Sequence, residues 1–123
     1  MDAVKKDVIN LVYKELESAN EKFPPFNSSH EGYAVIKEEI EEAEEQLIYT
    51  KEKLNVLWSN IKRNNIEFSL AHVYNLEELA INMAVEAIQV AAMAQKYIDS
   101  MEIINDEKSP LFLEKVFNHK KDI

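Results

Sequence analysis

The sequence predicts an all-α protein, an antiparallel helical bundle with one long central helix that oligomerisation completes. Three observations lead to this fold class. The 123 residues include one Gly and three Pro, fewer breakers than strands joined by tight turns need. Apolar residues recur at spacings of three and four along most of the chain. Hydrophobic residues make up 46% of the sequence, which is enough for one small core.

The first helix is predicted over residues 2–22. Val4, Val8, Leu11 and Leu16 repeat on one helical face in this segment. The sequence Phe-Pro-Pro-Phe at residues 23–26 then ends the helix, because two prolines force an extended backbone. We expect both Phe rings to pack this connection onto the core.

The second helix is predicted over residues 31–62, and Ser28 with Glu31 has the spacing of a capping box at its start. A helix of this length spans about 48 Å, whereas a compact chain of this size has a radius of gyration of roughly 14 Å. Either the helix breaks near Thr50 or its far end packs on another chain. Its apolar seam has the period of a coiled coil and comprises Ile36, Ile40, Ala43, Leu47, Thr50, Leu54, Leu57 and Ile61.

A turn is predicted at residues 63–65, and residues 66–74 fit either a short helix or an irregular connection. Asn75 with Glu78 again has the spacing of a helix cap, which predicts a third helix over 76–101. A loop is expected at 105–108 and a short last helix at 111–118, after Ser-Pro at 109–110. No repeat or linker interrupts the chain, so residues 1–123 are predicted to form a single domain.

The net charge of −9 and the lack of Cys narrow the function. So acidic a chain is a poor partner for a nucleic-acid duplex or an anionic membrane, since both are negatively charged. Residues 79–94 are too short for a membrane span, and residues 1–6 lack the apolar core of a signal peptide. A cytoplasmic location is therefore expected.

Eight residues, 38–45, form an acidic run that contains six Glu. Such runs are mostly solvated helix faces. However, Glu39 lies about 60° from the apolar direction of its helix, and Glu42 follows one turn later on the same flank. Two carboxylates this close repel each other unless a proton or cation joins them. The alternatives are therefore a solvated face and a site for a hard cation such as magnesium.

Asn82, Glu86 and Gln89 form one polar stripe on the otherwise apolar third helix. The stripe is either the solvent side of the helix or an inward-facing polar strip. In the second case Glu86 faces Glu39 and Glu42 across a shared cation, because a buried carboxylate needs a partner. His30 opens the second helix and either caps it or contacts a ligand.

Residues 26–42, FNSSHEGYAVIKEEIEE, resemble the segment that opens the first motif helix of MazG-like proteins, an all-α group of nucleoside triphosphate pyrophosphohydrolases. Residues 86–94, EAIQVAAMA, are similar to the later motif helix of these proteins. The resemblance implies that an EExxE motif and a later ExxD motif hold magnesium, with manganese as an alternative. It further implies hydrolysis of a nucleoside triphosphate to a monophosphate and pyrophosphate.

The resemblance also implies roles for individual residues. Gln89 stands where the family has Asp, and 43 residues separate Glu42 from Glu86, more than is usual for the family. Two hypotheses follow: a magnesium-dependent pyrophosphohydrolase, acting as a homodimer or homotetramer, and a catalytically degenerate helical scaffold. For the enzyme, the expected metal ligands are Glu39, Glu42, Glu86 and Gln89, the residue that orients or deprotonates water is Glu38, and the substrate-binding candidates are His30 and Asn82.

Overall fold

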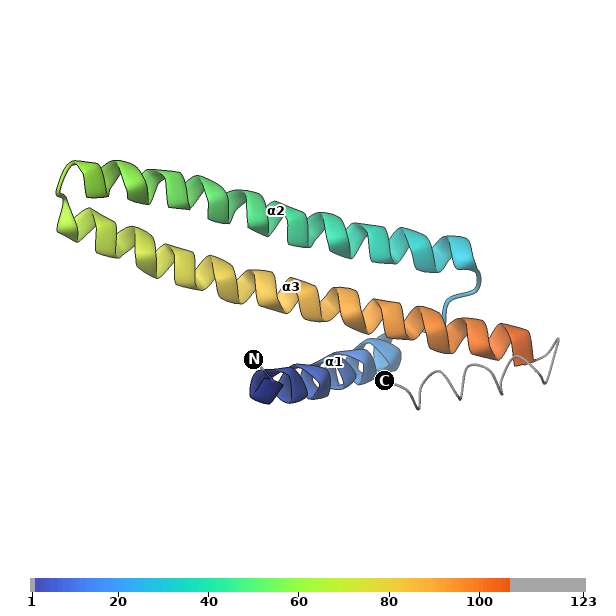
Figure 1. Cartoon of the computed structure of the whole chain (residues 1–123). Helices are drawn as coiled ribbons and strands as arrows, with labels where there is room; N and C mark the ends of the chain where they lie inside the picture. The colour runs from blue at the N-terminus through green and yellow to red at the C-terminus, as the bar shows by residue number, and fades with distance from the viewer. Residues whose placement is uncertain (1, 107–123) are drawn as a thin grey trace. The chain divides into compact units, whose positions relative to one another are not determined.

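The structure, a computed structural model, describes residues 2–106 and confirms the all-α fold class. It contains helices α1 (Asp2–Lys22), α2 (Ser29–Lys62) and α3 (Ile66–Asp106), and no strand occurs between residues 2 and 106 (Figure 1). In this part of the chain, no helix combines the length and apolarity required to cross a bilayer.

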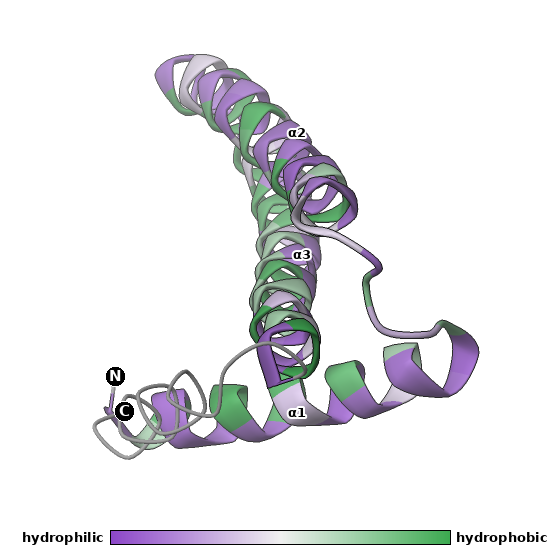
Figure 2. Cartoon of the chain, turned by 90° about the vertical axis from the view of Figure 1, so that its right-hand side faces the viewer, coloured by the Kyte–Doolittle hydropathy of each residue, from purple (hydrophilic) through white to green (hydrophobic). Residues whose placement is uncertain are grey.

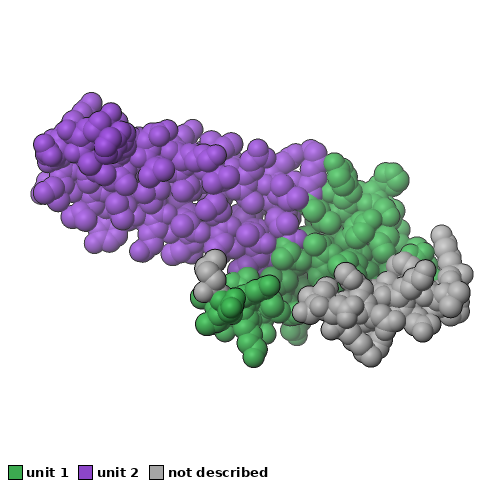
Figure 3. All heavy atoms as spheres, viewed as in Figure 1, with its two compact units in different colours: residues 1–36, 91–123 green, residues 37–90 purple. Residues whose placement is uncertain are grey.

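The chain divides into two compact units (Figure 3). Unit 1 consists of residues 1–36 and 91–123, of which 2–36 and 91–106 are described, and unit 2 is Lys37–Val90. Both boundaries fall inside α2 and α3 rather than in a linker.

Unit 2 is an antiparallel hairpin of two helical segments, residues 37–62 of α2 and 66–90 of α3 (Figure 1). The turn between them ends α2 in a Schellman motif. Asn65 N–H donates to Asn60 O and Asn64 N–H donates to Ile61 O, both at 3.0 Å. Asn64 has φ of 58°, a left-handed conformation that Asn tolerates well. Asn65 then caps α3, since its Oδ1 accepts the Phe68 N–H at 3.2 Å.

The cap at Asn65 explains why the predicted start of the third helix at residue 76 is wrong. Residues 66–74 are helical and continue into the rest of α3 without a break. Asn75 therefore lies exposed in the middle of a helix rather than at its start. At the other end, Asn105 and Asp106 are helical and not part of a loop. The remaining predicted loop residues, 107–108, and the predicted helix at 111–118 lie outside the described residues.

The second helix neither breaks near Thr50 nor requires another chain for its far end, the two alternatives expected from the sequence. α2 is unbroken at Thr50, whose Oγ1 donates to Gln46 O at 2.7 Å. α2 has 34 residues and α3 has 41, so α3 is long enough to run beside α2 along its length. A second chain is therefore not needed to pack against the far end of α2. The length of α2 therefore no longer argues for an oligomer.

In unit 1, the connection between α1 and α2 is fixed by Phe26. Its side chain is buried, at 6% exposure, and its backbone N–H donates to the buried Ser100 Oγ at 2.9 Å. Phe23 is 63% exposed, so only one of the two rings packs as predicted. Ser28 caps α2 as expected, because its Oγ accepts the Glu31 N–H at 3.2 Å, and Glu31 in turn accepts the backbone N–H of Asn27.

Lys96 is buried in the same unit, with only 4% of its surface exposed. Its ammonium lies 5.0 Å from the centre of the Phe26 ring and 5.9 Å from that of Phe23. Burial lowers the pKa of Lys96, and the negative charge of Glu31 opposes part of this effect. The ammonium thus loses contact with water and gains cation–π contacts. These contacts contribute about 0.5–2 kcal/mol, less than the desolvation cost of several kcal/mol.

Gly32 is required by close packing in unit 1. A Cβ at this position would clash with the Tyr97 ring and would lie 3.2 Å from Phe26 Cδ2. In an open helix, Gly→Ala stabilises by up to about 1 kcal/mol. Here we expect Gly32→Ala to destabilise by roughly 1–2 kcal/mol, because overpacking exceeds the propensity gain. Denaturant unfolding measures this, and the same change in a Tyr97→Ala background should be neutral or stabilising.

We also expect Lys96→Met to raise the unfolding midpoint at pH 7, because it removes a desolvated charge and keeps the apolar stem. The folded chain has the lower Lys96 pKa, so the wild type gains stability as pH rises from that pKa towards the ordinary value of 10.5. The advantage of the variant should therefore shrink as pH rises towards 10.5 and be smallest above that value, where Lys96 is neutral in both states. Thermal unfolding across this range checks it, and a pH-independent difference would contradict the explanation.

Candidate metal centre

The hairpin of unit 2 brings polar residues of α2 and α3 together through its register. Glu42 lies 22 residues before Asn64, at the turn, and Glu86 lies 22 residues after it. Glu39 and Gln89 each lie 25 residues from Asn64 on opposite sides. In an antiparallel pair, residues equidistant from the turn lie opposite each other. The register therefore places two carboxylates of α2 opposite the polar stripe of α3.

The three predicted carboxylates converge in this way. Glu39, Glu42 and Glu86 each offer one oxygen, and these three oxygens all lie within 4.8 Å of one another. Glu39 and Glu86 are half-buried. Oxygens at this spacing can bind one divalent cation, since Mg²⁺ and Ca²⁺ take carboxylate oxygens at about 2.0–2.6 Å. We call this set, with Gln89, the acidic cluster.

Gln89 bridges the two helices. With its amide nitrogen turned towards the carboxylates, it donates to Glu86 Oε2 at 3.0 Å and to Glu39 Oε2 at 3.1 Å. This orientation satisfies both contacts without a cation. The reverse orientation presents the amide oxygen to the same two carboxylates and is favourable only with a cation between them. The side chain therefore fits the cluster in either state.

The cluster shifts the protonation of Glu86. Burial raises the pKa of this carboxyl above its ordinary value, and the negative charge of Glu42 and a hydrogen bond with Glu42 raise it further. A proton or a cation is what relieves the repulsion between Glu42 and Glu86.

The rest of the acidic run faces solvent. Glu41 is exposed and forms an ion pair with Lys37. Glu45 accepts a hydrogen bond from Tyr49 Oη at 2.8 Å. Glu38 is exposed, and the structure does not bring it into the acidic cluster. The acidic run is therefore a solvated face at Glu38, Glu41 and Glu45, whereas Glu39 and Glu42 meet Glu86 of α3 and belong to the candidate cation site.

The two substrate-binding candidates are placed as follows. Asn82 is exposed on α3, one and two turns before Glu86 and Gln89 on the same flank. His30 is exposed in the first turn of α2 and belongs to unit 1. Sequence reasoning did not find the contacts of Gln89 with both carboxylates or the hydrogen bond between Glu42 and Glu86. The distances of these residues from the turn at 63–65 contain the information that pairs them.

Comparison of the chain with protein-family models, with curated proteins and with solved structures gives no match. The function is therefore inferred from the residues of the hairpin and from the resemblance of the sequence motifs.

Without divalent metal, we expect Glu86→Gln to raise the unfolding midpoint at pH 7. The folded chain has the higher Glu86 pKa, so stability falls as pH rises from the ordinary value of 4.5 through that pKa. The gain should therefore disappear below about pH 4.5, where the wild-type carboxyl is protonated in both states. Thermal unfolding in chelator measures this, and Glu78→Gln, an exposed neutralisation on the same helix, should leave the midpoint nearly unchanged.

Proposed function

We propose that the chain is a magnesium-dependent nucleotide pyrophosphohydrolase, which cleaves a nucleoside triphosphate to a monophosphate and pyrophosphate. The observation that supports this most is the meeting of Glu39, Glu42 and Glu86 from two helices within 4.8 Å. The sequence motifs that resemble MazG-like proteins contain these same residues. A chain with a net charge of −9 also needs a cation to hold a triphosphate.

The donor set fits a hard divalent cation. Three carboxylate oxygens supply the charge, and rotation of the Gln89 amide by 180° adds a neutral oxygen. Magnesium keeps several ligands from water and phosphate, so an incomplete protein shell suits it. When bound, it would neutralise phosphate oxygens and lower the pKa of a coordinated water. Glu39, Glu42 and Glu86 would hold the cation at the hairpin, and phosphate oxygens of the substrate would complete its ligands.

The other assigned residues remain proposals. Asn82 is proposed to hydrogen-bond a substrate at the cluster, because it is exposed on the same flank of α3 as Gln89. Glu38 is exposed and lies outside the acidic cluster, so its proposed role on the attacking water has no support from contacts. His30 is proposed only as a substrate contact from the start of α2.

A scaffold without turnover is the second candidate, and the contacts of Gln89 favour it. In the orientation that turns its nitrogen towards the carboxylates, the amide joins Glu39 and Glu86 by hydrogen bonds without a metal. In that case the cluster is a set of polar contacts that stabilises the packing of α2 on α3. Metal binding separates the two candidates.

We expect Mg²⁺ to raise the unfolding midpoint of the wild type, by mass action on the folded state, and a nucleoside triphosphate to raise it further. Glu39→Gln and Glu86→Gln should lose the magnesium effect and lower pyrophosphate release by roughly 100-fold or more, because losing even an outer-shell partner of a bound metal typically costs about 10–100-fold. Release of pyrophosphate with a panel of triphosphates measures turnover.

Glu41→Gln is the matched control, because it neutralises an exposed Glu of the same helix next to the ligand Glu42. It should keep both the magnesium effect and turnover. Full activity in Glu39→Gln and Glu86→Gln would exclude this mechanism. A wild type whose midpoint responds to no divalent metal and no nucleotide would favour the scaffold.

A further inference from the structure

Gln89 is the residue of the acidic cluster that can either donate or accept a hydrogen bond. The ionised carboxylates of Glu39, Glu42 and Glu86 only accept. With its amide nitrogen turned towards them, Gln89 donates to Glu86 Oε2 at 3.0 Å and to Glu39 Oε2 at 3.1 Å. A rotation of the amide by 180° replaces these two donors with one acceptor oxygen. Gln89 can therefore bind to the carboxylates of a metal-free cluster or to a cation, but not to both at once.

The metal-free arrangement satisfies the cluster within the hairpin. Gln89 joins Glu39 of α2 to Glu86 of α3, and Glu86 is in turn hydrogen-bonded with Glu42. Each of the three carboxylates thus has a partner. An N–H group carries a partial positive charge, and the two N–H groups of Gln89 point at oxygens that a cation would bind. A cation can therefore bind there only after these two hydrogen bonds are broken.

The surroundings of Gln89 make its two hydrogen bonds difficult to replace with water. Gln89, Glu39 and Glu86 are all half-buried, and the neighbouring Ile88 and Val90 are half-buried hydrophobic residues. α3 is also more hydrophobic than α2 (Figure 2). Hydrogen bonds to charged groups are the strong ones, and low polarity around them strengthens them further. The orientation of the Gln89 amide therefore affects how tightly the cluster binds a cation.

We infer that Gln89 couples the binding of magnesium to the binding of the triphosphate, so that free magnesium binds weakly and the two bind tightly together. This role of Gln89 rests on the proposed function. Three carboxylate oxygens leave several ligand positions of magnesium to be filled. Water fills them for the free ion, whereas a triphosphate fills them with charged oxygens and offsets the loss of the two hydrogen bonds. Because such coupling is reciprocal, the triphosphate also binds weakly without magnesium.

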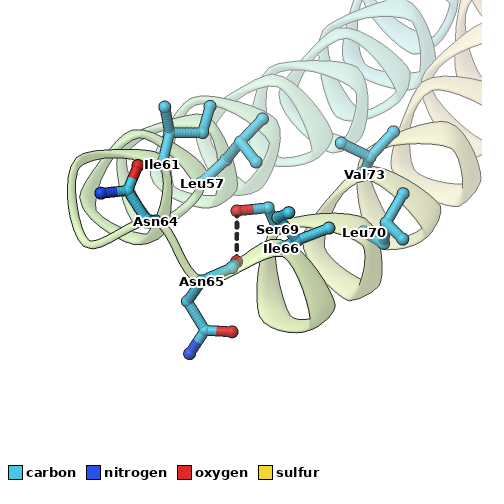
Figure 4. A pocket seen from close by; sticks show the side chains of 8 residues that line it. All are labelled: Leu57, Ile61, Asn64, Asn65, Ile66, Ser69, Leu70 and Val73. Carbon is cyan, nitrogen blue, oxygen red and sulfur yellow. Dashed lines mark hydrogen bonds between the residues drawn. The ribbon is translucent and has the colours of Figure 1, made fainter.

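The hollow at the turn end of the hairpin does not compete for the cation. It has a volume of about 380 Å³ and lies where Ser69 Oγ donates to Asn65 O at 2.7 Å (Figure 4). None of the residues that line it carries a charge: Leu57, Ile61, Asn64, Asn65, Ile66, Ser69, Leu70 and Val73. We therefore expect magnesium at the acidic cluster and not in this hollow.

The isosteric change Gln89→Glu tests the inference, because it keeps the length of the side chain and replaces both donors with a carboxylate. In chelator at pH 7, we expect a lower unfolding midpoint than in the wild type. Calorimetric titration should show that free magnesium binds roughly 10-fold or more tighter, within the usual range of coupling between two ligands. Asn75→Asp is the matched control, since it adds the same charge at an exposed position of α3 outside the cluster. It should leave both quantities nearly unchanged.

Inorganic triphosphate is the probe for the coupling, since it requires no assumption about the base. In the wild type, magnesium and triphosphate together should raise the unfolding midpoint by more than the sum of their separate effects. In Gln89→Glu, magnesium alone should produce most of the increase. Equal coupling in the two chains overturns the inference, as does a magnesium affinity or a metal-free midpoint that Gln89→Glu leaves unchanged.

A measurement on the wild type does not depend on the folding of the variant. In nuclear magnetic resonance spectra, the side-chain amide protons of Gln89 should exchange slowly with water in chelator. They should exchange faster once magnesium and inorganic triphosphate are both present, because both hydrogen bonds are then broken. Equal exchange rates in the two conditions overturn the inference.

Pyrophosphate release separates this inference from the proposed function. Turnover by the wild type, together with an unchanged magnesium affinity in Gln89→Glu, overturns the inference and leaves the proposed function standing. Tighter magnesium binding and weaker coupling in Gln89→Glu, without pyrophosphate release from any triphosphate, support the role of Gln89 and exclude turnover.

Discussion

The three-residue turn at 63–65 determines which side chains meet across the hairpin. Asn64 takes the left-handed conformation that closes α2, and Asn65 starts α3 at the next residue. With no slack in the turn, the register follows from residue number alone. Glu42 therefore meets Glu86 about 33 Å from the turn, and Glu39 meets Gln89 about 38 Å from it.

Two helices touch along a single line and enclose no core. This explains why the interface between the two helices of the hairpin includes polar side chains, whereas the centre of a larger bundle is apolar. Along this line α2 contributes Glu39, Gln46 and Thr50 as well as Ala43 and Leu57, all half-buried. Much of the apolar side-chain surface lies instead on one flank. The register set by the turn therefore brings polar side chains together between the helices, whereas many large apolar side chains remain exposed.

The sequence predicts those parts of the fold that local chemistry determines. The bounds of α1 agree, and α2 begins within two residues of its predicted start, because the Ser28 cap and the Pro-Pro break are local features. Residues 66–74 were ambiguous because aromatic and β-branched side chains there lower helix propensity. Asn75 with Glu78 resembles a cap, but packing on α2 and the true cap at Asn65 outweigh it.

The same distinction holds at the site. Angular position on a helix separated Glu39 and Glu42 from the outward Glu38, whereas for Glu86 the polar stripe left both a solvent-facing and an inward-facing orientation open. The two contacts of Gln89 depend on distances across the hairpin, which no single-helix pattern contains. Had residues 66–74 been assigned as helix, the turn would have given the pairing of α2 with α3 directly.

The long interval between Glu42 and Glu86 also has a simple structural meaning. Residues 50–62 and 66–79 pair with each other beyond the acidic cluster, so the interval is an extension of both arms of one hairpin. An insertion in the turn alone would rotate and slip one arm against the other and separate the carboxylates, although surface turns generally tolerate insertions. Lengthening both arms by one heptad would preserve the pairing. Related chains can therefore vary in length by fourteen residues, in equal steps on the two arms, and retain the same cluster.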